Sequence, residues 1–319
     1  MLSFSHLARQ LRDKLDDTLQ SNQQLLFEPA LSLSYRINNS SALIFTAGYR
    51  QKPFSEERLV SGPVYLSSRM IRANQPSLEL QETKSASATY LVRDLSRQFQ
   101  MNIGGVYVAT SGNFIPLLQV LTSEMRTVYT FFNGTGRFFS GDFMLEKYIP
   151  LLQGTVRVKN SFSRQQYQNA VNGSGLRQNK SSTVSPSLFF KTALDGKVNF
   201  EEYVEFRYST ARGEEGPAFR NRSLINNFKI IFKPSSRVFL LLNTDYFLPN
   251  LSRRQSAAFF FDADLRYEPK NKLYGCNLRL RNLFNITNLT RFETNDYSGS
   301  RYQMALLPRQ LTASVTRSF

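Results

Sequence analysis

Apolar and polar residues alternate in segments about ten residues long, and this pattern recurs through most of the chain. Successive side chains of a strand point to opposite faces, so each segment predicts a strand with one apolar and one polar face. In 257–267, for example, Phe259, Phe261 and Leu265 share one face, opposite Asp262 and Asp264. We count about thirteen such segments, 27–37, 41–50, 85–95, 99–110, 126–146, 155–167, 184–194, 198–209, 224–233, 238–247, 257–267, 273–283 and 311–319.

The links between these segments alternate in length. Short links rich in turn-forming residues lie at 38–40, 96–98, 195–197, 234–236 and 268–272, with a somewhat longer one at 147–154. Long links lie between them, at 51–84, 111–125, 170–183, 211–223, 249–256 and 284–308. Short turns at one rim and long loops at the other are typical of an antiparallel transmembrane β-barrel of the bacterial outer membrane.

The chain ends on an alternating run whose last residue is an aromatic. Leu311, Ala313, Val315 and Phe319 fall on one face, and Thr or Ser residues fall on the other. We predict that these four residues form the C-terminal assembly signal of the barrel. Their position also orients the chain, because it puts the short turns on the periplasmic side and every long link outside.

Composition agrees with a barrel and excludes a helical membrane protein. Hydrophobic residues make up 41% and charged residues 20% of the 319 residues. No stretch approaches the roughly 18 to 20 consecutive apolar residues that a membrane helix requires. Aromatic residues reach 13%, with 27 Phe and 15 Tyr, which suits aromatic girdles at two membrane interfaces.

Single Cys and His residues restrict the chemistry. Cys276 has no partner for an internal disulfide, and zinc sites built from Cys and His clusters are excluded. A Ser-His-Asp triad requires His6, which lies six residues from the N-terminus. We therefore predict no enzyme, no metal and no cofactor, and interpret Cys276 as a small strand residue.

The net charge of +16 raises the question of nucleic-acid binding. The 40 Lys and Arg residues are spread along the chain at strand spacing, without a dense basic block. No helix-turn-helix, zinc-finger or RNP-like pattern is visible, so no nucleic-acid partner is expected.

Residues 1–26 lie outside the strand pattern. Leu7, Leu11, Leu15 and Leu19 recur every four positions among charged residues, which is the spacing of a short amphipathic helix. The alternatives are part of an extracellular loop or a surface helix. No apolar stretch of an export signal is present, so the pattern favours the later part of a longer exported protein over a complete one. The strand domain is expected over 27–319.

The C-terminal third resembles TonB-dependent outer-membrane receptors. Asn282-Leu283-Phe284-Asn285 closes the penultimate strand segment, and Leu307-Pro308-Arg309 opens the last one, as in that family. The turn Lys147-Tyr148-Ile149-Pro150 resembles the barrels of large Bacteroidota receptors of this type. The resemblance is specific over about residues 273–319. Arg317 departs from it, because the family places an apolar or aromatic residue there.

The resemblance implies a receptor that binds a scarce extracellular ligand and admits it across the outer membrane. Complete receptors of this family have 22 strands around an N-terminal plug, and the plug and energy-coupling box have no counterpart here. The implied partners are outer-membrane lipid, the barrel assembly machinery, an unidentified ligand, and the plug and N-terminal strands of a full-length receptor. The long links 51–84 and 284–308 are the expected recognition loops.

Candidate lumen-facing residues come from the polar rows of the strand segments. They are Arg157, Lys159, Lys191, Arg207, Lys229, Asp262, Asp264, Arg266, Arg279 and Arg281, accompanied by Glu201, Glu205 and Asp245. One interpretation is a lumen that attracts anionic ligands or contacts a plug. The other, which we favour, is a solvated and ion-paired wall.

Two other functions stay open at this point. One is a complete barrel of 12 or 14 strands, acting as a porin or a barrel enzyme. The other is a soluble basic β-protein that binds nucleic acid.

Overall fold

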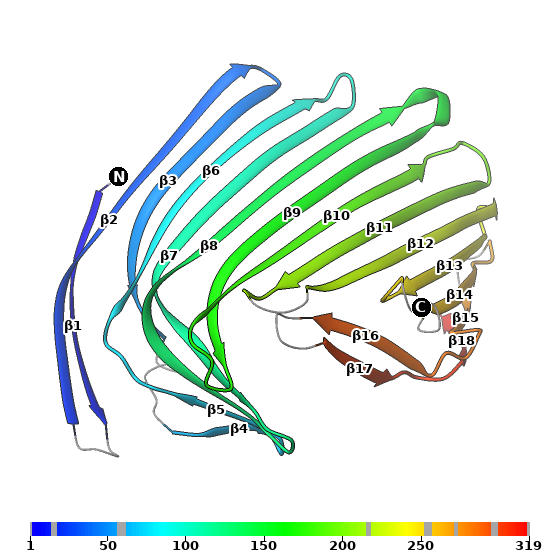
Figure 1. Cartoon of the computed structure of the whole chain (residues 1–319). Helices are drawn as coiled ribbons and strands as arrows, with labels where there is room; N and C mark the ends of the chain where they lie inside the picture. The colour runs from blue at the N-terminus through cyan, green and yellow to red at the C-terminus, as the bar shows by residue number, and fades with distance from the viewer. Residues whose placement is uncertain are drawn as a thin grey trace.

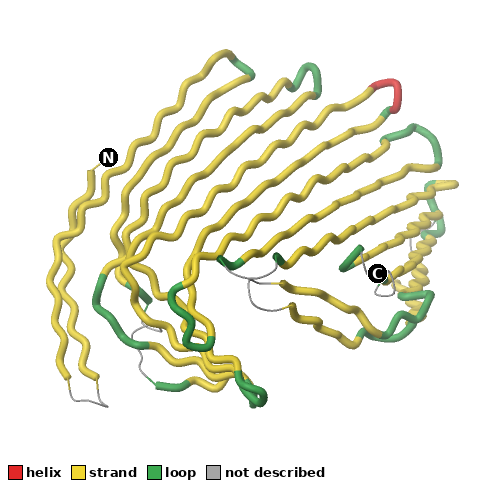
Figure 2. The backbone as a smooth tube through the Cα atoms, in the orientation of Figure 1, coloured by secondary structure: helices red, strands yellow, loops and turns green. Residues whose placement is uncertain are grey.

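A computed structural model describes residues 2–13, 18–55, 62–214, 218–251, 257–270, 274–294 and 299–317. Nearly all of them belong to one long sheet that curves like the wall of a barrel (Figure 1). Neighbouring strands along this wall are antiparallel, and a backbone tube shows almost no helix (Figure 2). The predicted all-β, antiparallel barrel architecture is therefore confirmed, and the wall described here is open.

Fourteen strands form the continuous path across the wall. Their bounds are β1 (Leu2–Asp13), β2 (Thr18–Asn38), β3 (Ser41–Pro53), β6 (Leu80–Asp94), β7 (Phe99–Val120), β8 (Met125–Ile149), β9 (Gly154–Val171), β10 (Arg177–Thr192), β11 (Val198–Arg212), β12 (Phe219–Ser235), β13 (Val238–Leu248), β14 (Ala258–Tyr267), β15 (Tyr274–Arg281) and β18 (Gln310–Arg317). The shorter elements are β4 (Val64–Ser67), β5 (Met70–Asn74), the 3-10 turn η1 (Pro150–Leu152), β16 (Asn288–Thr294) and β17 (Gly299–Ala305).

The strand register divides the wall into two faces. Leu31, Ala47, Ala86, Tyr107 and Phe139 are successive cross-strand partners, so they lie on one face. We call this the apolar face and its opposite the polar face. Large apolar side chains of this face are exposed, with Leu31, Tyr107 and Phe139 at 48%, 43% and 44%. Exposed apolar rows of this length are unusual in water and mark a lipid or protein contact.

Short turns connect strands at one rim, which we call the turn rim. They include 39–40, 95–98, 150–153, 193–197 and 236–237. In the turn after β6, the Ser96 hydroxyl and the Arg97 backbone N–H donate to Asp94 at 2.6 and 3.0 Å. These hydrogen bonds lower the pKa of Asp94, because they stabilise its ionised form. The Lys147-Tyr148-Ile149-Pro150 motif also ends in a turn, where η1 begins at Pro150.

At the opposite rim, which we call the loop rim, three predicted long links are wrong in part. Strand β7 continues to Val120 and β8 starts at Met125, so only four residues separate them. Strand β9 extends to Val171, which lies within the predicted link 170–183. Strand β12 starts at Phe219, which lies within the predicted link 211–223. Outside the alternating segments a strand still gains ladder hydrogen bonds with its neighbours, although apolar and polar residues no longer alternate in its sequence. The β7–β8 hairpin bends away from the wall in this region (Figure 1).

Residues 1–26 were expected to lie outside the strands, and this expectation is wrong for the described part. Leu2–Asp13 forms β1 and pairs with β2 in a continuous antiparallel register from Leu2↔Pro29 to Asp13↔Thr18. The four-residue Leu spacing therefore does not produce a helix. Pairing with β2 gives β1 ladder hydrogen bonds at alternate residues along its length, whereas a short isolated helix is only marginally stable. All thirteen predicted segments correspond to strands of the path, and β1 is the fourteenth.

A small core of buried apolar side chains lies near the loop rim. Among described residues, Ile71, Leu78, Ile115 and Leu118 are buried there. Strand β5 contributes to this cluster by pairing in parallel with the outer part of β8. Elsewhere the sheet is a single layer whose described end strands are β1 and β18.

Candidate functional site

A row of alternating charge crosses five strands on the polar face. Lys191, Glu201, Lys229, Asn243 and Asp262 are successive cross-strand partners from β10 to β14. The Glu201 carboxylate lies 2.6 Å from the Lys229 Nζ and 3.8 Å from the Lys191 Nζ. One carboxylate therefore links two of the predicted lumen-facing lysines.

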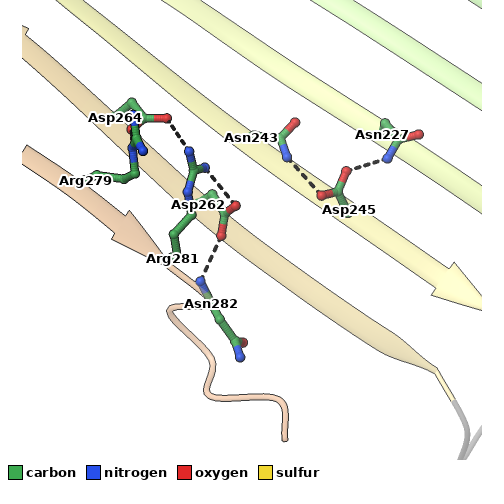
Figure 3. Close-up of polar contacts among 8 residues, drawn as sticks. All are labelled: Asn227, Asn243, Asp245, Asp262, Asp264, Arg279, Arg281 and Asn282. Atoms are coloured by element: carbon green, nitrogen blue, oxygen red, sulfur yellow. Dashed lines mark hydrogen bonds and ion pairs between the residues drawn. The ribbon is translucent and has the colours of Figure 1, made fainter. Parts of the chain in front are cut away.

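Two arginines and two aspartates form a compact ion-pair cluster at the C-terminal end of this face (Figure 3). Arg281 lies 2.9 Å from both Asp262 and Asp264, and Arg279 lies 2.8 Å from Asp264. Four residues that were predicted to share the polar face of β14 and β15 therefore lie in contact with one another. Their charges sum to zero, so the cluster is a balanced part of the wall.

Asp245 is held by carboxamides instead of cations (Figure 3). The Asn243 amide donates to it at 2.9 Å, and the Asn227 amide donates to its other oxygen. The sequence places Asn227, Asn243 and Asp245 on the polar faces of their strands, but it did not predict that the two asparagines donate to this carboxylate. A cavity of about 460 Å³ lies beside this group, lined by Phe189, Glu201, Tyr203, Asn227, Lys229, Asn243 and Asp245.

The other predicted cations divide into paired and unpaired residues. Arg207 lies 2.9 Å from Glu205, which also accepts from the Tyr203 hydroxyl. Arg157 pairs with Glu146, a partner that the sequence reasoning did not include. Within the described part of the chain, Lys159 and Arg266 have no carboxylate at ion-pair distance. Most of the row is neutralised, as an ion-paired wall requires.

The Asn282-Leu283-Phe284-Asn285 motif forms a structural joint at the end of β15. The Asn282 carboxamide accepts from the Ile286 N–H at 2.9 Å and donates to the Ile286 and Leu307 carbonyls at 2.8 and 3.0 Å. The Asn285 side chain accepts from the Arg309 N–H. Both asparagines have positive φ, of 53° and 54°, a conformation that Asn tolerates. The motif therefore fastens the entry of β18 to the exit of β15.

Part of the first expected recognition loop is ordered against β8. In 51–84, β4 pairs with β5, and β5 runs parallel to β8 with the pairing Met70↔Met125 to Asn74↔Tyr129. Phe54 packs edge-on against Phe114, with ring centroids 4.5 Å apart. The second loop, 284–308, contains the two-stranded sheet β16–β17. Among the residues of these two loops that the structure describes, none stands out as a ligand-binding centre.

The predicted assembly signal lies on the last strand. Leu311, Ala313 and Val315 pair with Leu280, Leu278 and Cys276 on the apolar face. Leu311 and Val315 are 69% and 70% exposed. Phe319 lies outside the described residues, so its placement stays a prediction.

Over the residues that the structure describes, no helix has the length and apolarity to cross a membrane. The same residues contain no group of three or more His, Cys, Asp or Glu side chains arranged to hold a metal ion.

Neither a protein-family model nor a curated protein matches the sequence. Among solved structures, FpvA of P. aeruginosa, bound to a heterologous pyoverdine, is similar with a TM-score of 0.48 at 10% identity, covering 93% of this chain and 47% of FpvA. The ferric preacinetobactin receptor BauA of Acinetobacter baumannii has a TM-score of 0.40 at 11% identity, with coverage of 92% and 54%. The toluene transporter TodX of Pseudomonas putida has a TM-score of 0.28 at 9% identity, with coverage of 98% and 86%. This chain spans about half the length of the first two.

Proposed function

We propose that this chain forms part of the wall of an outer-membrane transport barrel, with its apolar face toward lipid and its polar face toward a water-filled lumen. The observation that carries the proposal is the contrast between the two faces over the path from β2 to β18. Exposed apolar rows cover one face, and ion-paired rows cover the other. Lipid-exposed backbone must be fully hydrogen-bonded, which such a ladder provides.

The rims give the proposed orientation. Short turns at the turn rim correspond to the periplasmic side, and the longer excursions at the loop rim, including β4–β5 and β16–β17, correspond to the outside. In a bilayer the edges of β1 and β18 each require a partner. We therefore propose that further strands complete the barrel, and that barrel assembly machinery and outer-membrane lipid are its partners.

In finer terms we propose a receptor of the TonB-dependent type that binds an extracellular ligand and supports its uptake. The Asn282–Asn285 joint and the Leu307-Pro308-Arg309 entry to β18 support this assignment by their resemblance to that family. A plug would lie against the polar face, where the cavity beside Asp245 and the unpaired Lys159 and Arg266 offer contacts. This role requires no catalytic residue.

Membrane insertion tests the proposal directly. The full chain is refolded in the presence of phospholipid vesicles and separated by flotation after an alkaline wash. We expect it to float with the vesicles and to protect a strand-rich core from added protease. Recovery of a folded chain in the aqueous fraction, without vesicles or detergent, would contradict the proposal and favour the soluble alternative.

A further inference from the structure

Cations line up on the apolar face where it meets the loop rim. Lys84, Ala109, Arg137, Gln166, Lys180 and Arg212 are successive cross-strand partners from β6 to β11. Four of these six residues are basic and none is acidic. Because cross-strand partners share a face, these four cations point to the side that carries the apolar rows.

Three more cations lie in the two adjacent rows toward the turn rim. Arg164 is opposite Phe139 and Ser182, and Arg220 is opposite Thr210. Arg222 is opposite Tyr208, and its guanidinium lies 5.4 Å from that ring centroid. We call the seven residues the rim cluster: Lys84, Arg137, Arg164, Lys180, Arg212, Arg220 and Arg222.

The rim cluster is not neutralised by the chain. All seven residues are exposed, and none has a carboxylate at ion-pair distance among the described residues. The nearby carboxylates have other partners, since Glu82 accepts from Gln51 and Ser111, and Glu214 accepts from the Gln178 N–H. This differs from the polar face, where most cations are paired. Part of the net charge of +16 is therefore concentrated at one rim.

The surroundings of the rim cluster are those of a membrane interface. Tyr107, Phe139, Phe162 and Tyr208 occupy the neighbouring rows of the same face, as aromatic girdle residues do. At the turn rim, Lys147 and Arg317 on this face each lie over an aromatic ring, at 6.0 and 5.8 Å, as Arg222 does at the loop rim. The rim cluster is thus distinguished by the number of its cations and not by a lack of ring contacts.

We propose that the rim cluster binds the phosphate groups of a phosphorylated glycolipid in the outer leaflet. This proposal rests on the outer-membrane orientation given above. Arg binds phosphate oxygens through paired N–H donors, and a basic residue near a membrane surface attracts anionic headgroups. Arg137 and Lys180 lie two strands apart, roughly 10 Å. That spacing suits two phosphates on one headgroup while the acyl chains pack against the aromatic rows.

Lipid titration tests the proposal on the full chain. The probes are bisphosphorylated lipid A and lipid A from which both phosphates have been removed, each added to the folded protein in detergent, with bound lipid counted by native mass spectrometry. We expect at least about tenfold tighter binding of the bisphosphorylated form. The double variant Arg137→Gln/Lys180→Gln is expected to lose most of this preference.

The matched control is Lys159→Gln/Arg266→Gln, which removes two unpaired cations from the polar face. It is expected to keep the preference of the parent chain. Equal binding of both lipids, an equal loss in the control pair, or complete displacement of the lipid by millimolar inorganic phosphate would each overturn the proposal.

If the double variant does not fold, the lipid preference of the parent chain is measured at high salt instead. At roughly 1 M salt the Debye length falls to about 3 Å, so the preference of the parent chain is expected to fall. An unchanged preference at that salt concentration would overturn the proposal. Failure of the chain to float with vesicles would instead contradict the proposed function, so the two failures are distinguishable.

Discussion

Arg317 and Tyr274 are cross-strand partners on the apolar face, and the Arg317 guanidinium lies 5.8 Å from the Tyr274 ring centroid. The sequence showed Arg317 only as a departure from the family pattern in a lipid-facing row. The structure supplies a local reason for its tolerance, because the ring accommodates the cation at the turn rim. An aromatic and a cation at this height are both typical of a membrane interface.

We predict a coupling of about 0.5–1 kcal/mol between these two residues. A double-mutant cycle with Arg317→Leu and Tyr274→Leu measures it through denaturant unfolding of the refolded chain in vesicles. Arg317→Leu alone is expected to change stability little, since it restores an apolar residue to the row. A cycle in which the two substitutions are strictly additive would contradict the contact.

Asn282 is predicted to be the residue on which the joint between β15 and β18 depends. Asn282→Gly keeps the backbone freedom for positive φ but removes three side-chain hydrogen bonds, at a cost of about 2–3 kcal/mol. The control is Asn288→Ala, whose exposed side chain donates only to the neighbouring Thr287. Equal unfolding midpoints for the two variants would show that the joint is dispensable.

Gly112 is predicted to be required for the bend of the β7–β8 hairpin. Its φ is +66°, and an added Cβ would lie 2.6 Å from the Leu80 carbonyl oxygen. Gly112→Ala is expected to destabilise the fold by roughly 1–3 kcal/mol or to displace the hairpin. Gly105→Ala is the control, because its Cβ has only one neighbour within 4 Å, at 3.8 Å. Protease cleavage within 113–124 reports the displacement, and identical cleavage in both variants would contradict this role.

Glu202 is a carboxylate on the apolar face, opposite Phe190 and Phe228 and hydrogen-bonded by the Asn226 amide. If that face contacts lipid, Glu202→Gln keeps a hydrogen-bond acceptor and removes a charge from the bilayer. We predict a gain of about 1 kcal/mol in vesicles. The adjacent Glu201→Gln is expected to have the opposite sign, because it weakens the ion pair with Lys229. Destabilisation by both substitutions would argue against lipid at the apolar face.

Most of the fold was predicted from the alternation of apolar and polar residues. A strand with lipid on one face and water on the other has a sequence period of two. The alternation placed Asp262, Asp264, Arg279 and Arg281 on one face, and the structure joins them in one cluster. It failed for 2–13 and for the outer part of β7, where backbone pairing continues without any contrast between the two faces.

The alignment of neighbouring strands could not be predicted from the sequence. That Arg137, Gln166 and Lys180 share one row depends on how three strands are aligned, and no single segment contains this information. Glu202 was overlooked for a simpler reason, since its neighbours of the same parity are Phe200 and Val204. The hydrogen bonds of Asn282 likewise require the loop geometry.

The central claim is that the apolar face contacts lipid and the polar face contacts water. Leu278→Cys and Asn277→Cys, each in a Cys276→Ser background, place a thiol on adjacent residues of opposite faces. A charged, membrane-impermeant maleimide is added to the chain in vesicles, and labelling is followed over time. Reaction requires a thiolate in water, so we predict labelling at least about tenfold slower at residue 278 than at 277, with the difference abolished by unfolding in detergent. Equal labelling of the two sites in intact vesicles would contradict the account.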